Sequence, residues 1–121
     1  MSLARLHAVD VATLMPQVKE FVRCAGSISA VQQVILFGSM ARDQMTSASD
    51  IDLAVIVDTQ SDLRALKEKL RQLRCQLLQW PTDLFVCDTS WFESRKDFGG
   101  ICVAINQDGV VLFDRKTAEG V

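Results

Sequence analysis

The chain has 121 residues, a formal net charge of −2 and a hydrophobic content of 49 %. This length suits one domain with a single core, and the hydrophobic content indicates a packed globule rather than a disordered chain. The mild acidity argues against a protein that binds long nucleic acid through bulk electrostatics. The sequence has no run of 18 apolar residues and no signal-peptide pattern, so we expect a cytoplasmic protein that does not enter a membrane.

The first half of the chain predicts one helix followed by two strands. Apolar residues at helical spacing predict the helix over residues 10–25, with Pro16 marking the first turn of its main segment and Gly26 as its stop. Residues 31–37 and 51–57 are nearly continuous apolar runs. Runs of this kind are typical of strands that are buried on both faces, so we expect helices to pack over the sheet.

Residues 61–79 form the clearest predicted helix, because their leucines recur at intervals of three and four. This segment is shorter than three heptads, so we expect the helix to pack against the sheet rather than to form a coiled coil. Four basic residues form a second stripe on the same helix: Arg64, Lys67, Arg71 and Arg74. A stripe of this kind is usually a solvated face, and a surface that binds a partner or steers phosphates is the alternative.

The remaining predicted elements are short. We expect strands at residues 81–87 and 110–113, helices at residues 89–97 and 101–106, and a frayed end over residues 116–121. This order of elements predicts an α/β (α+β) fold with a central mixed sheet flanked by helices. No internal repeat or linker divides the chain, so we expect a single domain over residues 1–121.

Cysteine and histidine offer little chemistry in this sequence. Four cysteines lie among apolar neighbours without a C-x-x-C pair: Cys24, Cys75, Cys87 and Cys102. We therefore expect buried free thiols in a reducing cytoplasm rather than disulfides or zinc ligands. His7 is the single histidine and lies near the N-terminus, which argues against a histidine-based triad or a zinc site.

Two aspartates, Asp50 and Asp52, stand where the second predicted strand begins. Side chains two residues apart on a strand point to the same face, so both carboxylates project from one side. The preceding strand ends at Gly38 and Ser39, where the glycine permits unusual dihedral angles and the serine can cap a helical turn. Backbone amides at such a turn bind phosphate, and paired carboxylates bind Mg²⁺. Each feature alone is usually structural, whereas their combination suits metal-assisted phosphoryl or nucleotidyl transfer.

Residues 38–42, Gly-Ser-Met-Ala-Arg, are followed at residues 50–53 by Asp-Ile-Asp-Leu. This pattern resembles the signature of the polymerase-β-type nucleotidyltransferase superfamily, and above all its minimal nucleotidyltransferase (MNT) proteins. The resemblance implies that Asp50 and Asp52 hold Mg²⁺. It also implies a third acid on the next strand, a place that Asp83 occupies, with Asp88 at the far end of that strand as the weaker competitor.

The same resemblance implies roles for the residues around these acids. Gly38 and Ser39 would hold β- and γ-phosphate oxygens, so we expect a Gly38→Val variant to fold but to lose ATP binding. Arg42 would neutralise phosphate charge or brace the loop, and Ser49 would orient the loop. Asp43 departs from the family pattern, which often has glycine there, and a carboxylate near phosphates is unfavourable unless it is paired or turned away.

The implied reaction transfers a nucleoside monophosphate, AMP from ATP, to a hydroxyl with two Mg²⁺ ions. The chain has little length left for an acceptor-binding domain, so the acceptor is either small or brings its own docking surface. MNT proteins commonly act as antitoxins of a helical HEPN toxin, which makes such a protein the expected partner, with a homodimer when the partner is absent. The alternatives are a catalytically silent antitoxin and an enzyme that modifies a small molecule such as an aminoglycoside.

Overall fold

The computed structural model of the protein describes residues 11–119. Its strands are β1 (Val31–Phe37), β2 (Ile51–Val57), β3 (Thr82–Asp88) and β4 (Val110–Asp114). Its helices are α1 (Val11–Gly26), α2 (Gly38–Ala41), α3 (Leu63–Leu77), α4 (Thr89–Arg95), α5 (Ile101–Asp108) and α6 (Arg115–Glu119). None of these helices is long and apolar enough to cross a membrane.

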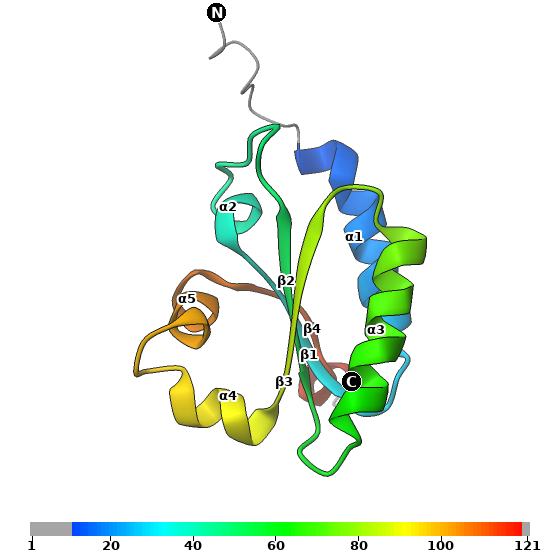
Figure 1. Cartoon of the computed structure of the whole chain (residues 1–121), viewed down its shortest axis with the longest axis vertical. Coiled ribbons are helices and arrows are strands. Elements are labelled where there is room, and N and C mark those ends of the chain that lie inside the picture. Colours follow the sequence, from blue (N-terminus) through cyan, green and yellow to red (C-terminus); the bar gives the residue numbers. More distant parts are fainter. Residues whose placement is uncertain (1–10, 120–121) are drawn as a thin grey trace, which may run out of the picture.

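The four strands form one mixed sheet in the order β3-β2-β1-β4. Strand β1 runs antiparallel to both β2 and β4, whereas β3 runs parallel to β2. Helices α1 and α3 lie on one side of the sheet, and α2, α4 and α5 lie on the other (Figure 1). The expected α/β domain with a central mixed sheet and flanking helices is therefore confirmed.

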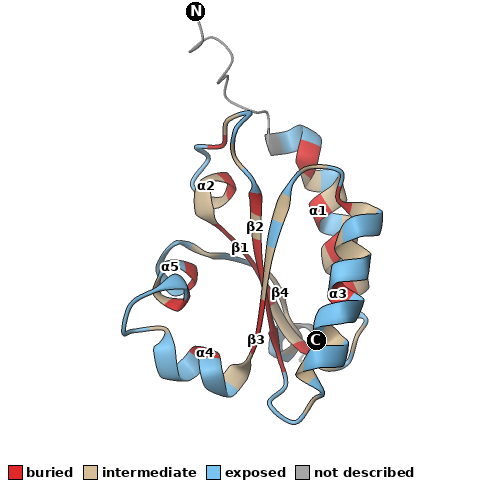
Figure 2. Cartoon of the chain, viewed as in Figure 1, coloured by how far each residue is buried: buried red, intermediate tan, exposed pale blue. Residues whose placement is uncertain are grey.

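Side chains alternate along the central strands and so build two separate cores. Leu53 and Val55 of β2 belong to the larger core, beneath α1 and α3, whereas Ala54 and Ile56 belong to a smaller core with residues of α4 and α5. The buried residues therefore concentrate along the middle of the sheet, while the outer surfaces of α3 and α4 face solvent (Figure 2). Burial on both faces explains why the strands read as continuous apolar runs.

The expected boundaries of β1 and β2 agree with the structure, and those of the helices shift. Helix α3 begins after Asp62, whose carboxylate accepts a hydrogen bond from the amide of Ala65 at 3.2 Å and so caps the helix. Helix α1 ends at Gly26 as expected, but Pro16 lies inside it. Its expected start at residue 10 lies outside the described residues.

The C-terminal segment differs from the expectation of a frayed end. Residues 115–119 form α6, because Arg115 ties this part of the chain to the sheet. Its guanidinium donates hydrogen bonds to the carbonyl oxygens of Gly26 at 2.6 Å, Ile28 at 3.0 Å and Val31 at 2.9 Å. One side chain thus supplies hydrogen-bond donors to three carbonyl oxygens that lie far from it in the sequence.

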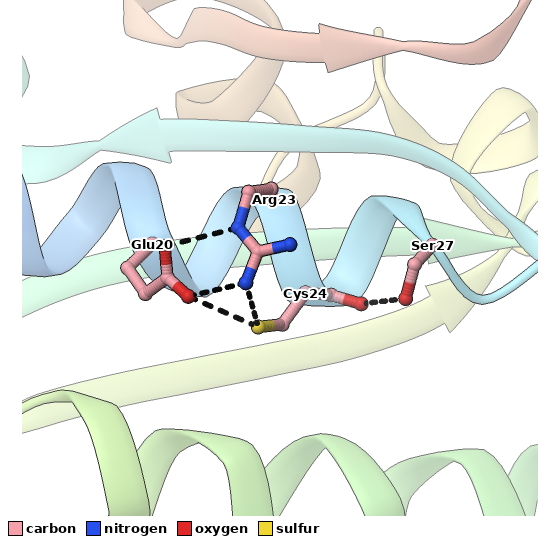
Figure 3. A network of polar contacts seen from close by, with 4 residues as sticks. All are labelled: Glu20, Arg23, Cys24 and Ser27. Carbon is pink, nitrogen blue, oxygen red and sulfur yellow. Dashed lines mark hydrogen bonds and ion pairs between the residues drawn. The ribbon is translucent and has the colours of Figure 1, made fainter.

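All four cysteines are free, but only two of them are buried as expected. Cys87 and Cys102 lie in the smaller core, and burial raises the pKa of Cys87 to about 12, which makes that thiol inert. Cys75 is exposed, so the expectation of burial is wrong there. Cys24 lies half-buried on α1 beside an ion pair, and its carbonyl accepts a hydrogen bond from Ser27 where the helix ends (Figure 3). His7 lies outside the described residues.

Candidate active site

One end of the sheet gathers the predicted site residues. Because β1 is antiparallel to β2, the end of β1 lies beside the start of β2, where Phe37 pairs with Asp52. Because β3 is parallel to β2, its start lies at the same end, and Asp52 pairs there with Asp83. The turn at Gly38 therefore lies next to two carboxylates that are far apart in sequence.

The alternation of β2 and β3 decides which face these carboxylates occupy. Asp52 shares its face with Ala54 and Ile56 of the smaller core, and Asp83 shares its face with Cys87 of the same core. Asp50 lies directly before β2, and its negative charge acts on the carboxyl group of Asp52. Asp52 and Asp83 thus point away from the larger core, toward the side of the sheet that carries α2, α4 and α5.

Asp52 has a carboxyl group whose surroundings disfavour its charged form. Burial raises the pKa of its carboxyl group, and the negative charges of Asp83 and Asp50 raise it further, whereas Arg42 acts in the opposite direction. Asp50 and Asp83 are exposed to solvent, while Asp52 is half-buried. The site therefore concentrates negative charge around a carboxylate that would be stabilised by a cation.

The acids do not yet converge on one point. Within residues 11–119, no three carboxylate, imidazole or thiol groups are gathered closely enough to hold a metal ion. The three carboxyl groups that we expected to hold Mg²⁺ together are therefore not gathered into a metal site in this arrangement. The donor set still fits Mg²⁺, which prefers carboxylate oxygens, and Asp83 lies directly opposite Asp52 in the register of β2 and β3.

Gly38 has a structural reason to be glycine. Its φ angle is +74°, and a Cβ atom at this position would lie 2.1 Å from Oδ2 of Asp52. Real Cβ atoms do not approach so closely, so the bare backbone of Gly38 is what allows Asp52 its place. The expectation that Gly38→Val folds and loses ATP binding stays a prediction, and the contact with Asp52 adds that the valine side chain would displace this carboxylate as well as block a phosphate.

Ser39 does not cap the turn as expected. The N-cap position of α2 belongs to Phe37, without any side-chain hydrogen bond, and Ser39 lies inside the helix. The carbonyl of Ser39 instead accepts a hydrogen bond from the amide of Gln44 at 2.8 Å, which folds the following loop back onto α2. Ser39 nevertheless stays directly beside Gly38 at the acidic end of the sheet.

Arg42 braces the loop and reaches toward α5. Its Nε donates a hydrogen bond to Gln44 at 3.1 Å, and its Nη1 lies 3.9 Å from the Asp108 carboxylate. The next residue, Asp43, adopts a left-handed conformation with φ of 57°. This is the position where the family often has glycine, so Asp43 occupies a conformation that glycine adopts at lower cost. Asp43 is exposed to solvent.

Ser49 holds the other end of this loop. Its hydroxyl accepts a hydrogen bond from the amide of Thr46 at 3.0 Å, and its carbonyl accepts one from the indole of Trp80 at 2.8 Å. Met45, directly before Thr46 in the sequence, is only 2 % exposed and anchors the loop in the larger core. Our reading of the sequence missed Trp80; its position directly before the third strand was a usable signal, because a buried indole N–H needs an acceptor.

Asp88 is excluded from this site by its position. It pairs with Val57 at the opposite end of β2, and its carboxylate accepts a hydrogen bond from the amide of Trp91 at 2.7 Å. Asp88 therefore caps α4, which leaves Asp83 as the acid that β3 contributes to the site.

Comparison with known proteins places this arrangement in context. The family described as polymerase beta, nucleotidyltransferase matches residues 17–118. No curated protein matches the chain. Among solved structures, a candidate nucleotidyltransferase from Sulfolobus solfataricus is 21 % identical with a TM-score of 0.58, and the alignment covers 88 % of this chain and 85 % of that one.

Two further structures are described as toxin–antitoxin complexes. One, with AMP-PNP, is 22 % identical with a TM-score of 0.57, and the alignment covers 87 % of this chain and 77 % of that one. The other, a mutant of MntA–HpeT, is 17 % identical with a TM-score of 0.51, and the alignment covers 93 % of this chain and 79 % of that one. At these identities the likeness extends to the fold.

Proposed function

Since this chain belongs to the polymerase beta nucleotidyltransferase family, we propose that it transfers AMP from ATP to a hydroxyl acceptor and releases pyrophosphate. The observation that carries the proposal is the juxtaposition of Asp52 and Asp83 in register, with the bare backbone of Gly38 against Asp52. Metal-assisted phosphoryl transfer uses backbone amides at a turn to hold phosphate and neighbouring carboxylates to hold the metal, and the turn at Gly38 beside Asp52 offers both kinds of group.

Each predicted residue then has a task. Asp50, Asp52 and Asp83 would hold two Mg²⁺ ions, which supply Lewis-acid stabilisation of the phosphates when bound. The amides at Gly38 and Ser39 would orient the β- and γ-phosphates. The oxygen of the acceptor hydroxyl bonds to the α-phosphorus of ATP while the bond from that phosphorus to pyrophosphate breaks. Asp83, the exposed acid of β3, takes the proton that the hydroxyl loses.

Arg42 and Ser49 act on the geometry of the site. Arg42 lowers the pKa of Asp52, and its charge lies where it would also offset that of the phosphates. Ser49 keeps the loop closed directly before Asp50 through its hydrogen bonds to Thr46 and Trp80. In this proposal Arg42 and Ser49 position the acids and adjust their charge, and neither residue contacts the reacting atoms.

The acceptor hydroxyl belongs, in this proposal, to a separate helical HEPN-type toxin, and the chain acts as its antitoxin. Support comes from the two toxin–antitoxin structures of similar fold, one of them with the ATP analogue AMP-PNP. The description of the other names glutamate substitutions at two aspartates that lie two positions apart, the spacing of Asp50 and Asp52. Without its partner, the chain would form a homodimer.

A second candidate is an antitoxin that binds its partner without catalysis. The left-handed Asp43 favours it, because a side chain there stiffens the loop between the phosphate turn and the acids. The exposed carboxylate also adds negative charge near the place proposed for the triphosphate. The two candidates differ in whether pyrophosphate is released.

The test uses the chain purified with its bound partner from the native host and incubated with ATP labelled at the α-phosphate. We expect Mg²⁺-dependent labelling of the partner and release of pyrophosphate. Asp52→Asn should reduce both by about 1000-fold, the loss of about 4 kcal/mol of transition-state stabilisation. Binding without labelling would favour the silent antitoxin. Recovery of no partner, together with labelling of a small alcohol or sugar, would favour the small-molecule enzyme.

A further inference from the structure

The outer edge of β3 is unpaired within the described sheet, since this strand pairs only with β2. The amide of Ile51 donates a hydrogen bond to the Pro81 carbonyl at 2.8 Å, so the backbone groups of alternate residues from Pro81 onward face β2. Those of Thr82, Leu84 and Val86 therefore face outward. In agreement, the Thr82 carbonyl accepts a hydrogen bond from the side chain of Arg74 at 3.3 Å.

A groove runs along this edge between β3 and α3. Its floor on β3 is apolar and consists of Leu84, Phe85 and Val86. Its wall on α3 includes Leu63, Ala65 and Glu68 together with the four basic residues of the predicted stripe: Arg64, Lys67, Arg71 and Arg74. Beyond Lys67 and Phe85 the groove continues toward Trp91, which is 38 % exposed and lies against the ring of Phe85.

The charges in this groove are mostly positive. Its two acids are already engaged, because Asp62 caps α3 and Glu68 forms an ion pair with Arg71. The side chains of Arg64 and Lys67 form neither a hydrogen bond nor an ion pair with any residue between 11 and 119. The chain as a whole is acidic, with a net charge of −2, so this groove is a local exception.

We propose that the groove binds an extended, acidic segment of a partner protein, which adds a strand to the β3 edge. Main-chain hydrogen bonds to Leu84 and Val86 would supply affinity, and carboxylates over Arg64 and Lys67 would supply specificity. A second copy of this chain would bring the same basic stripe against itself, which opposes pairing of two β3 edges.

The direction of the groove links this surface to the active site. The β3 strand that forms its floor starts at the end of the sheet where Asp83 lies, so a segment that follows β3 reaches the acids at one end. Such a segment would carry the acceptor hydroxyl there, a part of the inference that rests on the proposed function. Docking itself requires neither nucleotide nor metal, so it can be tested separately.

The test measures binding of a fluorescein-labelled short peptide of alternating glutamate and valine, in EDTA and without ATP, by fluorescence anisotropy. Lys67→Glu should weaken binding by at least about tenfold, because it reverses a charge that faces the groove. Lys69→Glu is the matched control: it makes the same change on the same helix, at an exposed residue outside the groove, and should leave affinity within about twofold. Hydrogen exchange should show the amides of Leu84 and Val86 protected by the peptide.

Three results would overturn the proposal. The first is equal loss of affinity in both lysine variants, which would mean non-specific attraction. The second is binding without protection of Leu84 and Val86. The third is a short oligouridylate that binds more tightly than the peptide and loses its affinity in Lys67→Glu, which would assign the groove to single-stranded nucleic acid. Because no transfer is measured, a failure of the proposed reaction leaves these results unchanged.

Discussion

The two faces of the sheet differ in what their side chains do. Within residues 11–119, the face beneath α1 and α3 belongs to a core of 16 buried residues, whereas the core on the opposite face has eight. Along β2 the smaller core ends at Ala54, and Asp52 takes the next position on that face, paired with Phe37 of the same core. The larger core continues to the start of β2 through Ile51, which is fully buried.

This difference shows how one strand separates stability from chemistry. Along β2, the residues at Ile51, Leu53 and Val55 stabilise the fold, while the alternate position at Asp52 is free to be acidic. The larger core holds the backbone of β2 in place. That backbone positions Asp52, and the surroundings of Asp52 raise the pKa of its carboxyl group. We therefore expect substitutions on the two faces to affect different quantities.

The largest effect on stability should follow from Leu53→Ala, on the face of the larger core. Leu53 is fully buried, and its truncation should lower the free energy of unfolding by about 2–5 kcal/mol, because a cavity forms that its neighbours fill only in part. Urea unfolding followed by circular dichroism measures the loss. If Leu53→Ala lost Mg²⁺-dependent turnover while the protein stayed folded, the separation between the faces would be broken.

Gly38→Ala should be the next largest, because Gly38 lies where the acidic face meets the turn. Its positive φ and the approach to Asp52 should together lower the free energy of unfolding by about 1–3 kcal/mol. In an Asp52→Ala background the carboxyl group is absent, so the same change should cost only about 1 kcal/mol. Equal costs in both backgrounds would contradict the packing of Gly38 against Asp52.

Asp43→Gly should have a smaller effect of the opposite sign. Removing the side chain from a left-handed residue should raise the free energy of unfolding by a few tenths of a kcal/mol, up to about 1 kcal/mol. Asp43→Ala keeps a Cβ atom and should give no gain, which makes it the control. A gain of the same size from alanine would show that charge at this position matters rather than backbone conformation.

Asp52→Asn should have the smallest effect on the free energy of unfolding, measured in EDTA so that no metal ion is bound. The folded protein raises the pKa of Asp52, so the stability that its protonated form contributes is present below the unfolded pKa of about 3.9 and is lost as the pH rises through the folded pKa. Asparagine does not ionise, so the variant should be slightly more stable than the natural chain at neutral pH. The difference should vanish at low pH, and a variant that is less stable at neutral pH would contradict this sign.

The sequence was most informative where local pattern decides structure. The continuous apolar runs of β1 and β2 predict their boundaries, and the leucine spacing predicts α3, because burial imposes these patterns directly. The glycine turn and the aspartate pair predict which end of the sheet carries the site. The shared face of Asp50 and Asp52, expected from their spacing of two residues, stays a prediction, because Asp50 lies just outside β2.

What escaped prediction depends on contacts between distant residues. The order of the C-terminal helix rests on Arg115, whose three acceptors lie more than 80 residues earlier. The strain that a side chain at position 38 would meet rests on Asp52, across the strand pair. The raised pKa of Asp52 rests on its burial and on Asp83 of the neighbouring strand, which lies 31 residues later in the sequence.

The most direct test of the central claim measures whether Mg²⁺ binds at the acidic face. Urea unfolding of the natural chain and of Asp52→Asn is compared in EDTA and in excess MgCl₂, without nucleotide or partner. A ligand that binds only the folded state raises the free energy of unfolding, so Mg²⁺ should stabilise the natural chain and have almost no effect on the variant. Equal stabilisation of both proteins, or of neither, would contradict the assignment of a metal site to Asp52 and its neighbours.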